Sequence, residues 1–134
     1  MSTNSGIALR SGETFQTIYC HWDGAPRTML PILRENYNSL ELAAKLISYG
    51  DASSIDKKLE PTPGVAHCFM QPEKEVCVFY YRDRGDDWFS CQPTCYTQKE
   101  LFGQSDFEYV YIFEDGQWNS YNMNGRKVNT YGYA

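Results

Sequence analysis

The chain has 134 residues, a formal net charge of −5 and a hydrophobic content of 42%. This length suffices for one hydrophobic core and is too short for two ordinary domains, and the composition excludes a disordered chain. The acidic balance argues against direct binding of nucleic-acid phosphates, which requires a basic face. We therefore expect a single domain over residues 1–134, in which residues 1–12 are flexible apart from a short edge strand at Ile7–Leu9.

The five cysteines are an odd number, which argues against a disulfide framework and favours a compartment with reduced thiols. No secretory leader precedes Cys20 and no apolar run reaches membrane-spanning length, so we expect a cytoplasmic protein without membrane contact. No spacing demands a metal site or a cofactor, and we expect neither. A four-ligand zinc set can still be drawn on paper from Cys20, His21, His67, Cys68, Cys91 and Cys95.

The first predicted strand covers residues 13–22 and ends at the turn pair Asp23-Gly24. Successive side chains of a strand point to opposite faces, so the alternation separates two sets of residues. One set is apolar and is expected to join the core: Ile18, Cys20 and Trp22. The other set places a phenol, an imidazole and a carboxylate in a row: Tyr19, His21 and Asp23.

The row that begins at Tyr19 has two interpretations. In an acid/base site, His21 acts as a general base oriented by Asp23. Arg82 or Arg84 then stabilises the developing negative charge. As a purely structural feature, the tyrosine packs, the histidine donates to a backbone carbonyl and the aspartate caps the turn. The catalytic interpretation requires the imidazole and a guanidinium to share one cleft.

Two short helices are predicted next. Apolar residues recur at helical spacing over residues 28–37, where Pro31 is tolerated only in the first turn. Residues 38–50 form the clearer helix, because Asn38 with Glu41 resembles a capping box and a glycine ends the segment. Both apolar stripes are expected to pack on the core face of the first strand, since helices this short need tertiary contacts.

Asp51, Ser53 and Ser54 directly follow the second helix. Such Asp/Ser clusters commonly form turns by hydrogen bonding to their own backbone. Alternatively, the serine hydroxyls and nearby backbone amides hold an anion or a hydroxyl-rich ligand, with the aspartate beside them. Both interpretations fit the residues.

A central strand is predicted over residues 75–83, because neither of its alternating faces is polar. The strand runs into alternating charges at residues 82–87, a pattern typical of a solvated turn with weak ion pairs. The functional alternative makes Arg82 or Arg84 a clamp for a carboxylate or phosphate, held in place by the neighbouring aspartates.

The C-terminal part predicts one helical turn at residues 98–103 and a three-stranded antiparallel meander from residue 106. Asp115-Gly116 and Asn124-Gly125 mark its turns, because both pairs suit the positive φ angles of type I′ hairpins. Together the elements predict an α+β fold: a mixed, mainly antiparallel sheet, two short helices packed on one face and a C-terminal β-meander.

Five segments of the chain resemble one family. They are Ile18–Gly24, Glu35–Tyr37, Leu46–Ile55, Tyr81–Gly85 and Tyr109–Trp118. In these segments the chain is similar to a family of small uncharacterised proteins of bacteriophages, prophages and other mobile elements. It departs from the family at residues 25–29, where relatives carry a glycine-richer loop. The resemblance implies a phage context and the cytoplasm of a bacterial host, and it brings no established chemistry.

No Walker loop, dinucleotide fingerprint, His-Glu-x-x-His or Gly-x-Ser-x-Gly motif is present, so binding is favoured over catalysis. The favoured function is that of an accessory protein that binds and inhibits a host protein, for example in a CRISPR or other defence system. Abundant tyrosine suits such an interface. The expected contacts are aromatic residues taken to be exposed: Trp88, Trp118 and Tyr121.

Two alternatives remain beside the host-protein hypothesis. One is a small-ligand protein that captures a nucleotide-like molecule with Ser53, Ser54 and Arg82. The other is a weak hydrolase that uses the Tyr19, His21 and Asp23 row with an arginine. Replacement of His21 by alanine that left every activity and ligand affinity unchanged would exclude the second.

Overall fold

The computed structural model describes residues 2–103 and 105–134. In these residues eight strands form one mixed sheet. The strands are β1 (Ser5–Ser11), β2 (Thr14–Cys20), β3 (Ala52–Ser54), β4 (Val78–Phe79), β5 (Thr94–Thr97), β6 (Tyr109–Glu114), β7 (Gln117–Asn122) and β8 (Lys127–Val128). The helices are α1 (Pro26–Asn36), α2 (Leu40–Ser48), α3 (Trp88–Cys91), α4 (Gln98–Gly103) and the π-helix η1 (Tyr80–Arg84).

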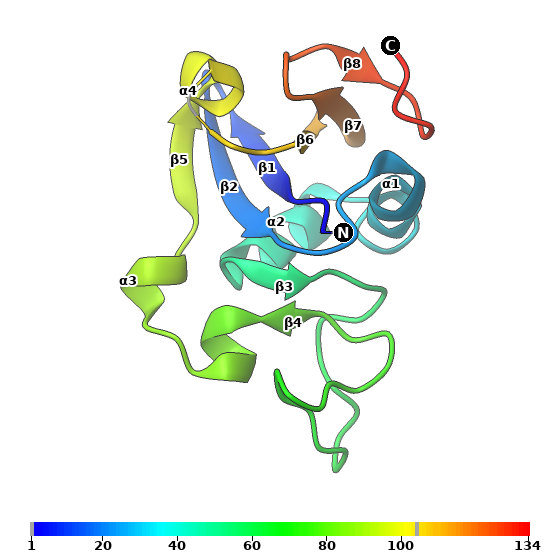
Figure 1. Ribbon diagram of the computed structural model, residues 1–134, viewed down its shortest axis with the longest axis vertical. Coiled ribbons are helices and arrows are strands. Elements are labelled where there is room, and N and C mark those ends of the chain that lie inside the picture. The colour runs from blue at the N-terminus through cyan, green and yellow to red at the C-terminus, as the bar shows by residue number, and fades with distance from the viewer. Residues whose placement is uncertain (1, 104) are drawn as a thin grey trace.

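The strands follow the order β4-β3-β2-β1-β6-β7-β8 across the sheet (Figure 1). Most neighbours are antiparallel, whereas β1 with β6 and β2 with β3 are parallel. One edge of β2 is shared by two strands: its first residues, Thr14–Thr17, pair with β5, and Cys20 pairs with Ala52 of β3. The sheet therefore forks along β2, and the predicted α+β class with a mainly antiparallel sheet is confirmed.

One face of the sheet carries the larger core. Ile18 and Cys20 of β2 are fully buried there against α1 and α2, as the alternation predicts. Trp22 does not join them: its exposed fraction is 46%, because β2 ends at Cys20 and the chain then turns away. The inclusion of Trp22 in the core is therefore wrong.

The opposite face is covered by α4 and by the segment before β6. Leu101 and Phe107 pack there on Ala8 and Phe15, with Tyr19 at the margin of the cluster. This second, smaller cluster leaves part of the β2 face open around Thr17 and Tyr19.

The expectation of a flexible N-terminus is wrong for most of the segment. Ser5–Ser11 form strand β1 at the centre of the sheet, hydrogen bonded to β2 on one side and β6 on the other. Residues Ile7 and Ala8 are fully buried. The central position of β1 cannot be recognised from its own short sequence, because β1 is buried by pairing with β6, a parallel strand about a hundred residues away.

Both predicted helices are present with shifted bounds. In α1, Pro26 occupies the start and Pro31 lies inside the helix, so the helix begins earlier than the proline suggested. In α2, the Ser39 hydroxyl accepts the Leu42 N–H at 3.1 Å, so Ser39 and not Asn38 is the N-cap. None of the described helices combines the length and apolar character that crossing a membrane requires.

The predicted central strand at residues 75–83 is wrong. Only Val78–Phe79 form a strand, β4, at one end of the sheet order, and the chain then continues as η1. The Asp83 carboxylate accepts the Phe79 N–H at 2.8 Å, so a local side-chain bond replaces a strand partner. The periodicity of apolar residues does not reveal that a side chain will take a backbone N–H in place of a neighbouring strand.

The C-terminal meander of β6, β7 and β8 is confirmed. Asp115 and Gly116 have φ angles of 52° and 77°, as a type I′ turn requires. In the second turn only Gly125 has a positive φ, because the Asn122 side chain accepts the N–H groups of Asn124 and Arg126 and shapes a wider turn.

Candidate functional site

Tyr19 and His21 form a close pair on the face of β2 opposite α1 and α2. The Tyr19 hydroxyl lies 2.6 Å from His21 Nδ1, which is a hydrogen-bonding distance. Burial, followed by the charges of Cys20, Asp51 and Glu108, raises the pKa of the Tyr19 phenol. The pair is thus a hydrogen-bonded phenol and imidazole.

Asp23 does not complete the predicted row. It is exposed, has a φ of 55° in the turn after β2 and, within the described part of the chain, makes no hydrogen bond to His21. The imidazole instead packs edge to face on Trp22, with 4.7 Å between ring centroids. Among residues 2–103 and 105–134, therefore, no carboxylate is hydrogen bonded to His21 to orient it as a general base.

Asp51 occupies the fork of the sheet, where β3 and β5 diverge along β2. Its Oδ1 accepts the Tyr19 N–H at 2.8 Å, which would otherwise lack a strand partner. Its main chain is fixed by Cys91 O at 2.8 Å and Tyr80 N at 3.2 Å. Burial raises the pKa of the Asp51 carboxyl from 3.8 to about 6, although the Tyr19 bond opposes the shift.

Gly50 sets the position of Asp51. Its φ is +84°, and a Cβ atom there would lie 2.4 Å from the carbonyl oxygen of Cys91 and 3.1 Å from the Trp88 ring. Only glycine allows this approach of α3 to the end of α2. The close packing of α3 on Gly50 therefore fixes the backbone next to Asp51 and, with it, the position of the Asp51 side chain.

Tyr19 and Asp51 line a cavity of about 320 Å³, which we call the fork cavity. Its aromatic wall is formed by Phe107, whose ring centroid is 6.4 Å from that of Tyr19 and 6.2 Å from that of Tyr96. Phe107 can lie flat on β1 because Gly6 beneath it has no side chain; a Cβ there would be 2.7 Å from the ring. The remaining lining residues are Asn4, Thr17, Thr94, Ser105 and Asp106.

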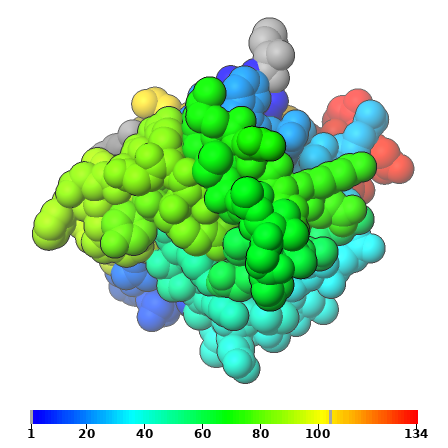
Figure 2. Space-filling model, turned by 90° about the horizontal axis from the view of Figure 1, so that it is seen from below, coloured from blue at the N-terminus to red at the C-terminus, as the bar shows by residue number. Residues whose placement is uncertain are grey.

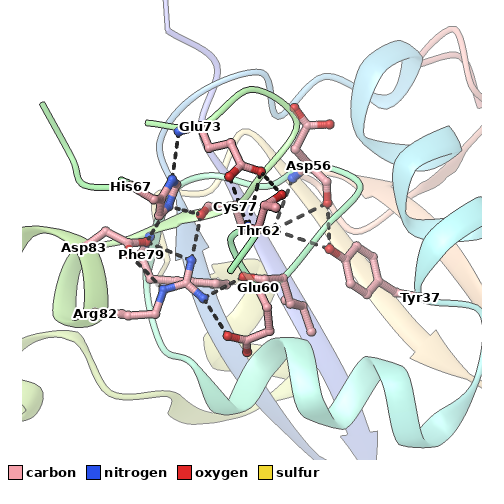
Figure 3. Close-up of polar contacts among 11 residues, drawn as sticks. Tyr37, Asp56, Glu60, Thr62, His67, Glu73, Cys77, Phe79, Arg82 and Asp83 are labelled. Atoms are coloured by element: carbon pink, nitrogen blue, oxygen red, sulfur yellow. Dashed lines mark hydrogen bonds and ion pairs between the residues drawn. The ribbon is translucent and has the colours of Figure 1, made fainter. Parts of the chain in front are cut away.

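Arg82 is committed to a polar network beside β4 (Figure 3). Its Nε and Nη2 donate to the Asp83 carboxylate at 2.8 and 3.0 Å. Nη1 donates to Leu59 O at 2.6 Å and Nη2 also donates to Cys77 O at 2.9 Å. The guanidinium thus links Leu59, Cys77 and Asp83, and these donors serve the fold instead of a ligand.

His67 completes this network from the loop between β3 and β4. Its Nδ1 accepts the Glu73 N–H at 2.9 Å, and its Nε2 lies 3.1 Å from Cys77 O and 3.4 Å from the Asp83 carboxylate. The side chains of His67 and Asp83 are only 1% and 3% exposed. The network therefore ties a long loop to η1.

Arg84 faces solvent and is also paired. Its guanidinium donates to both carboxylate oxygens of Asp86, at 2.7 and 2.6 Å, and lies 4.2 Å from the centroid of the Tyr80 ring. Tyr19 and Asp51 line the fork cavity, whereas Arg82 lines a different one. His21 contacts Tyr19 and Trp22, whereas Arg82 and Arg84 bond to residues of the β3–β4 loop and η1 and to Asp86. These contacts therefore do not bring the His21 imidazole and either guanidinium together.

Ser53 and Ser54 lie in a strand instead of a ligand-binding turn. Ser53 is buried in β3, and its carbonyl accepts the Trp22 N–H at 2.9 Å. Ser54 pairs with Val78 of β4. The turn expected at this segment is wrong, because β2 supplies a parallel partner for it.

The three predicted contact residues have different environments. Trp118 is fully buried, and its indole N–H donates to Tyr37 O at 2.8 Å, so its assignment to an exposed surface is wrong. Tyr121 is half-buried on Phe102 and bonds to Glu114. Trp88 is half-buried in α3 and accessible at one side.

Trp88 belongs to what we call the aromatic surface, formed by η1, α3 and the end of α2. A cavity of about 370 Å³ opens there, and the rings of Tyr81 and Trp88 meet edge to face at 5.1 Å. Tyr81 is 51% exposed and Phe89 is 80% exposed. Figure 2 shows the face of the molecule to which this yellow-green segment contributes. We define the aromatic surface as four residues that line the cavity, Tyr49, Tyr81, Arg82 and Trp88, together with Phe89, the exposed residue that follows Trp88 in α3.

All five cysteines are free thiols. Burial raises the pKa of the Cys20 thiol to about 12, so this group stays protonated. Among residues 2–103 and 105–134, no group of three or more His, Cys, Asp and Glu side chains is arranged to hold a metal ion. The zinc set drawn from the sequence is therefore not assembled in these residues.

Sequence reasoning missed most of the fork cavity. Tyr96 and Thr94 come from β5, an unpredicted strand in an aperiodic segment, and Phe107 precedes β6. It also missed Phe89, although the adjacent aromatic pair Trp88-Phe89 in a segment without periodicity was an available signal for an exposed ring. Only Tyr19 and Asp51 were singled out from the sequence.

Comparisons with protein-family models, curated proteins and solved structures find no match for this chain. The geometry by itself defines an α+β protein with two candidate binding features, the fork cavity and the aromatic surface. The first combines a half-buried carboxyl with aromatic rings, and the second presents exposed rings around an apolar cavity.

Proposed function

We propose that this protein acts by binding a partner protein, as an accessory protein of a phage or another mobile element that inhibits a protein of its bacterial host. A defence component is the kind of target that fits this context. The observation that carries the proposal is the aromatic surface. The resemblance to mobile-element proteins supplies the phage context, and the host cytoplasm is the corresponding location.

The composition of the aromatic surface supports docking on a protein. Tryptophan, tyrosine and arginine dominate the energetic anchors of protein interfaces, and they line this cavity. Arg82 is fixed by its bonds to Leu59 and Cys77, so the cavity wall is ordered before a partner arrives. The cavity is therefore suited to receive one apolar side chain of a partner, and the exposed ring of Phe89 follows Trp88 in α3.

Charge supports the same proposal. The net charge of −5 favours approach to a basic partner. Asp87 is exposed at the start of α3 beside the rings, and Asp86 is already paired with Arg84. Rim carboxylates of this kind affect the association rate more than the final affinity.

Site-specific photocrosslinking in host lysate tests the proposal. A photoreactive phenylalanine at position 89 is compared with the same group at position 123, where Met123 is also exposed but lies in the β7–β8 turn. We expect a discrete crosslinked protein from position 89 alone. W88A and Y81A in the position-89 protein should each reduce its yield at least about tenfold, as for an interface anchor.

The same products from positions 89 and 123, or a product insensitive to both substitutions, would contradict docking at the aromatic surface. Folding of each variant is checked by circular dichroism. The inhibitory part of the proposal is tested separately, by adding excess purified protein to the captured partner and measuring the partner's own activity.

A second candidate function is the binding of a small ligand, and the fork cavity favours it. Its volume lies near the lower end of ligand pockets, which span about 300–1,000 Å³. Polar groups and aromatic rings converge on it, as in many ligand sites. By contrast, Ser53 and Arg82, which sequence reasoning combined in a ligand site, are engaged elsewhere by β3 and the His67 network.

A further inference from the structure

We infer that the fork cavity is a binding site for a small organic cation, a protonated primary amine. This inference rests on the second candidate function, and it is independent of docking at the aromatic surface. It follows from three features of the cavity: an unpaired carboxylate, aromatic walls and the limited volume.

Asp51 supplies a carboxylate without a cationic partner. Its Oδ1 accepts the Tyr19 N–H, and among the described residues neither a lysine nor an arginine forms an ion pair with Asp51. Charges that proteins withdraw from water are normally paired or hydrogen bonded. The second carboxylate oxygen, Oδ2, has no partner in the described chain and remains available for a donor on a ligand.

The remaining charges around the cavity have the same sign. Asp106 is a lining residue, and the Glu108 carboxylate is close enough to Tyr19 to raise the pKa of its phenol. The lining includes neither lysine nor arginine. The site therefore repels phosphate and carboxylate groups and attracts a cation.

The walls suit an organic cation better than a hydrated metal ion. Tyr19, Tyr96 and Phe107 place three rings around the space, in tilted and edge-to-face contacts. Ring faces attract ammonium groups and pack against the attached carbon chain. Metal ions would need several oxygen or nitrogen ligands, and no such group is arranged in the described residues.

Hydrogen bonding narrows the class to a primary amine. A primary ammonium group carries three N–H donors, one of which can bond Asp51 Oδ2. Hydroxyl oxygens of Thr94 and Tyr96 in the lining can accept the others. A quaternary ammonium has no donor for the carboxylate. The volume of about 320 Å³ admits a short alkyl amine or the end of a lysine side chain.

Affinity for the amine should increase as pH rises through about 6, where the Asp51 carboxyl loses its proton. The deprotonated carboxylate pairs with the cation, while the amine itself stays charged in this range. Titratable groups that face Asp51 come from each neighbouring element: Tyr19 from β2, Tyr80 from η1 and Cys91 from α3, with Asp106 and Glu108 beyond them. Burial raises the pKa of each of these two phenols and of the thiol, so they do not produce this dependence. His21 is bonded to Tyr19, and the D51N variant below separates the effect of Asp51 from that of the imidazole.

Titration followed by two-dimensional ¹H–¹⁵N NMR tests the inference, because it detects millimolar binding and locates it. The probes are n-butylamine, the neutral n-butanol and Nα-acetyl-lysine N-methylamide. We expect n-butylamine to shift the amide signals of Tyr19, Asp51 and Thr94, and to bind up to about tenfold more tightly at pH 7.5 than at pH 5. The alcohol should bind at least about tenfold more weakly.

Two variants and the lysine probe complete the experiment. D51N preserves the acceptor for Tyr19 and should abolish both the preference for amine over alcohol and the pH dependence. D115N removes the same charge from the exposed β6–β7 turn and should leave amine binding unchanged. Tighter binding of the lysine derivative than of butylamine would identify a lysine side chain as the source of the ammonium; weaker binding would identify a free amine.

Each negative result has a distinct meaning. Equal binding of amine and alcohol by the wild-type protein would overturn the cation inference but leave a small-ligand site. No shift by any probe at these amides would overturn both. If D51N failed to fold, the comparison of pH 5 with pH 7.5 in the wild-type protein would still distinguish a cation site from a small-ligand site without a preference for amines.

Discussion

Asp51 connects the geometry of the fork with the pH dependence of stability. Its folded-state pKa of about 6 exceeds the value of 3.8 for an unperturbed carboxyl, so the folded protein retains a proton that the unfolded chain has released between these values. The stabilising effect of the Asp51 proton is thus complete below about pH 4 and is lost as pH rises through about 6.

The first prediction concerns D51N and D51A. Asparagine keeps the acceptor for the Tyr19 N–H and carries no charge, so the midpoint of thermal unfolding of D51N should equal or exceed that of the wild type at pH 7.5. Alanine leaves the Tyr19 N–H without its partner and should cost about 1–3 kcal/mol. Thermal unfolding from pH 4 to 8 measures both; a D51N midpoint well below the wild type at pH 7.5 would contradict the account.

The second prediction contrasts two arginines that are close in sequence. R82A removes donors to Leu59, Cys77 and Asp83 and leaves the nearly buried Asp83 carboxylate without its cation, at a cost of about 2–4 kcal/mol in the free energy of unfolding. R84A removes an exposed pair with Asp86 and should leave stability close to the wild type.

Urea unfolding compares these two variants directly. Hydrogen exchange adds a local measurement, because R82A should accelerate exchange of the Cys77 amide, which donates to Lys58 O beside the network. Equal stabilities of R82A and R84A would show that the network around His67 does not hold the loop.

At the scale of single elements, the contact of α3 with the end of α2 depends on Gly50. The third prediction is that G50A costs about 2–4 kcal/mol, because the added Cβ meets Cys91 O at 2.4 Å and the backbone has a positive φ. G12A is the matched control: Gly12 has a φ of +64° but no atom within 4 Å of the added Cβ, so only about 1 kcal/mol is expected. Similar losses in chemical denaturation would mean that the close approach is unimportant.

Element by element, the sequence predicts those structures whose determinants are local. The hairpin turn at Asp115-Gly116 and the apolar stripe of α2 are visible because neighbouring residues alone decide them. The segment at residues 75–83 was mispredicted, because the Asp83 side chain takes the Phe79 N–H and Arg82 reaches back to Cys77. Distant partners decide strands such as β3 and β5, which have few residues and no periodic pattern.

The candidate sites follow the same division. Tyr19 and His21 were found because they lie in one strand, and their contact needs only the alternation of side chains. The partnership of Tyr19 with Asp51 depends on the fork of the sheet, which no local pattern encodes. The aromatic surface also depends on the tertiary structure, which places Trp118 in the core and Phe89 outside it.

At the scale of the whole molecule, protection should follow the order of the sheet. The fourth prediction is that amides of β1 exchange with solvent most slowly, because β1 is bonded on both sides by β2 and β6. Exchange should be at least about tenfold faster at β4 and in residues 57–76, which lie at or beyond an edge. Native-state hydrogen exchange followed by NMR measures this order, and faster exchange in β1 than in β4 would contradict the sheet arrangement.

The parallel pairing of β1 with β6 has a consequence for synthesis on the ribosome. Asn4 bonds to Glu108, 104 positions along the chain, so the first strand emerges long before its partner has been translated. Until about residue 114 has left the exit tunnel, the nascent β1–β2 hairpin presents an unprotected edge to other chains. A polypeptide stalled before that point would self-associate and need a chaperone, whereas one released after β7 could complete its sheet without help.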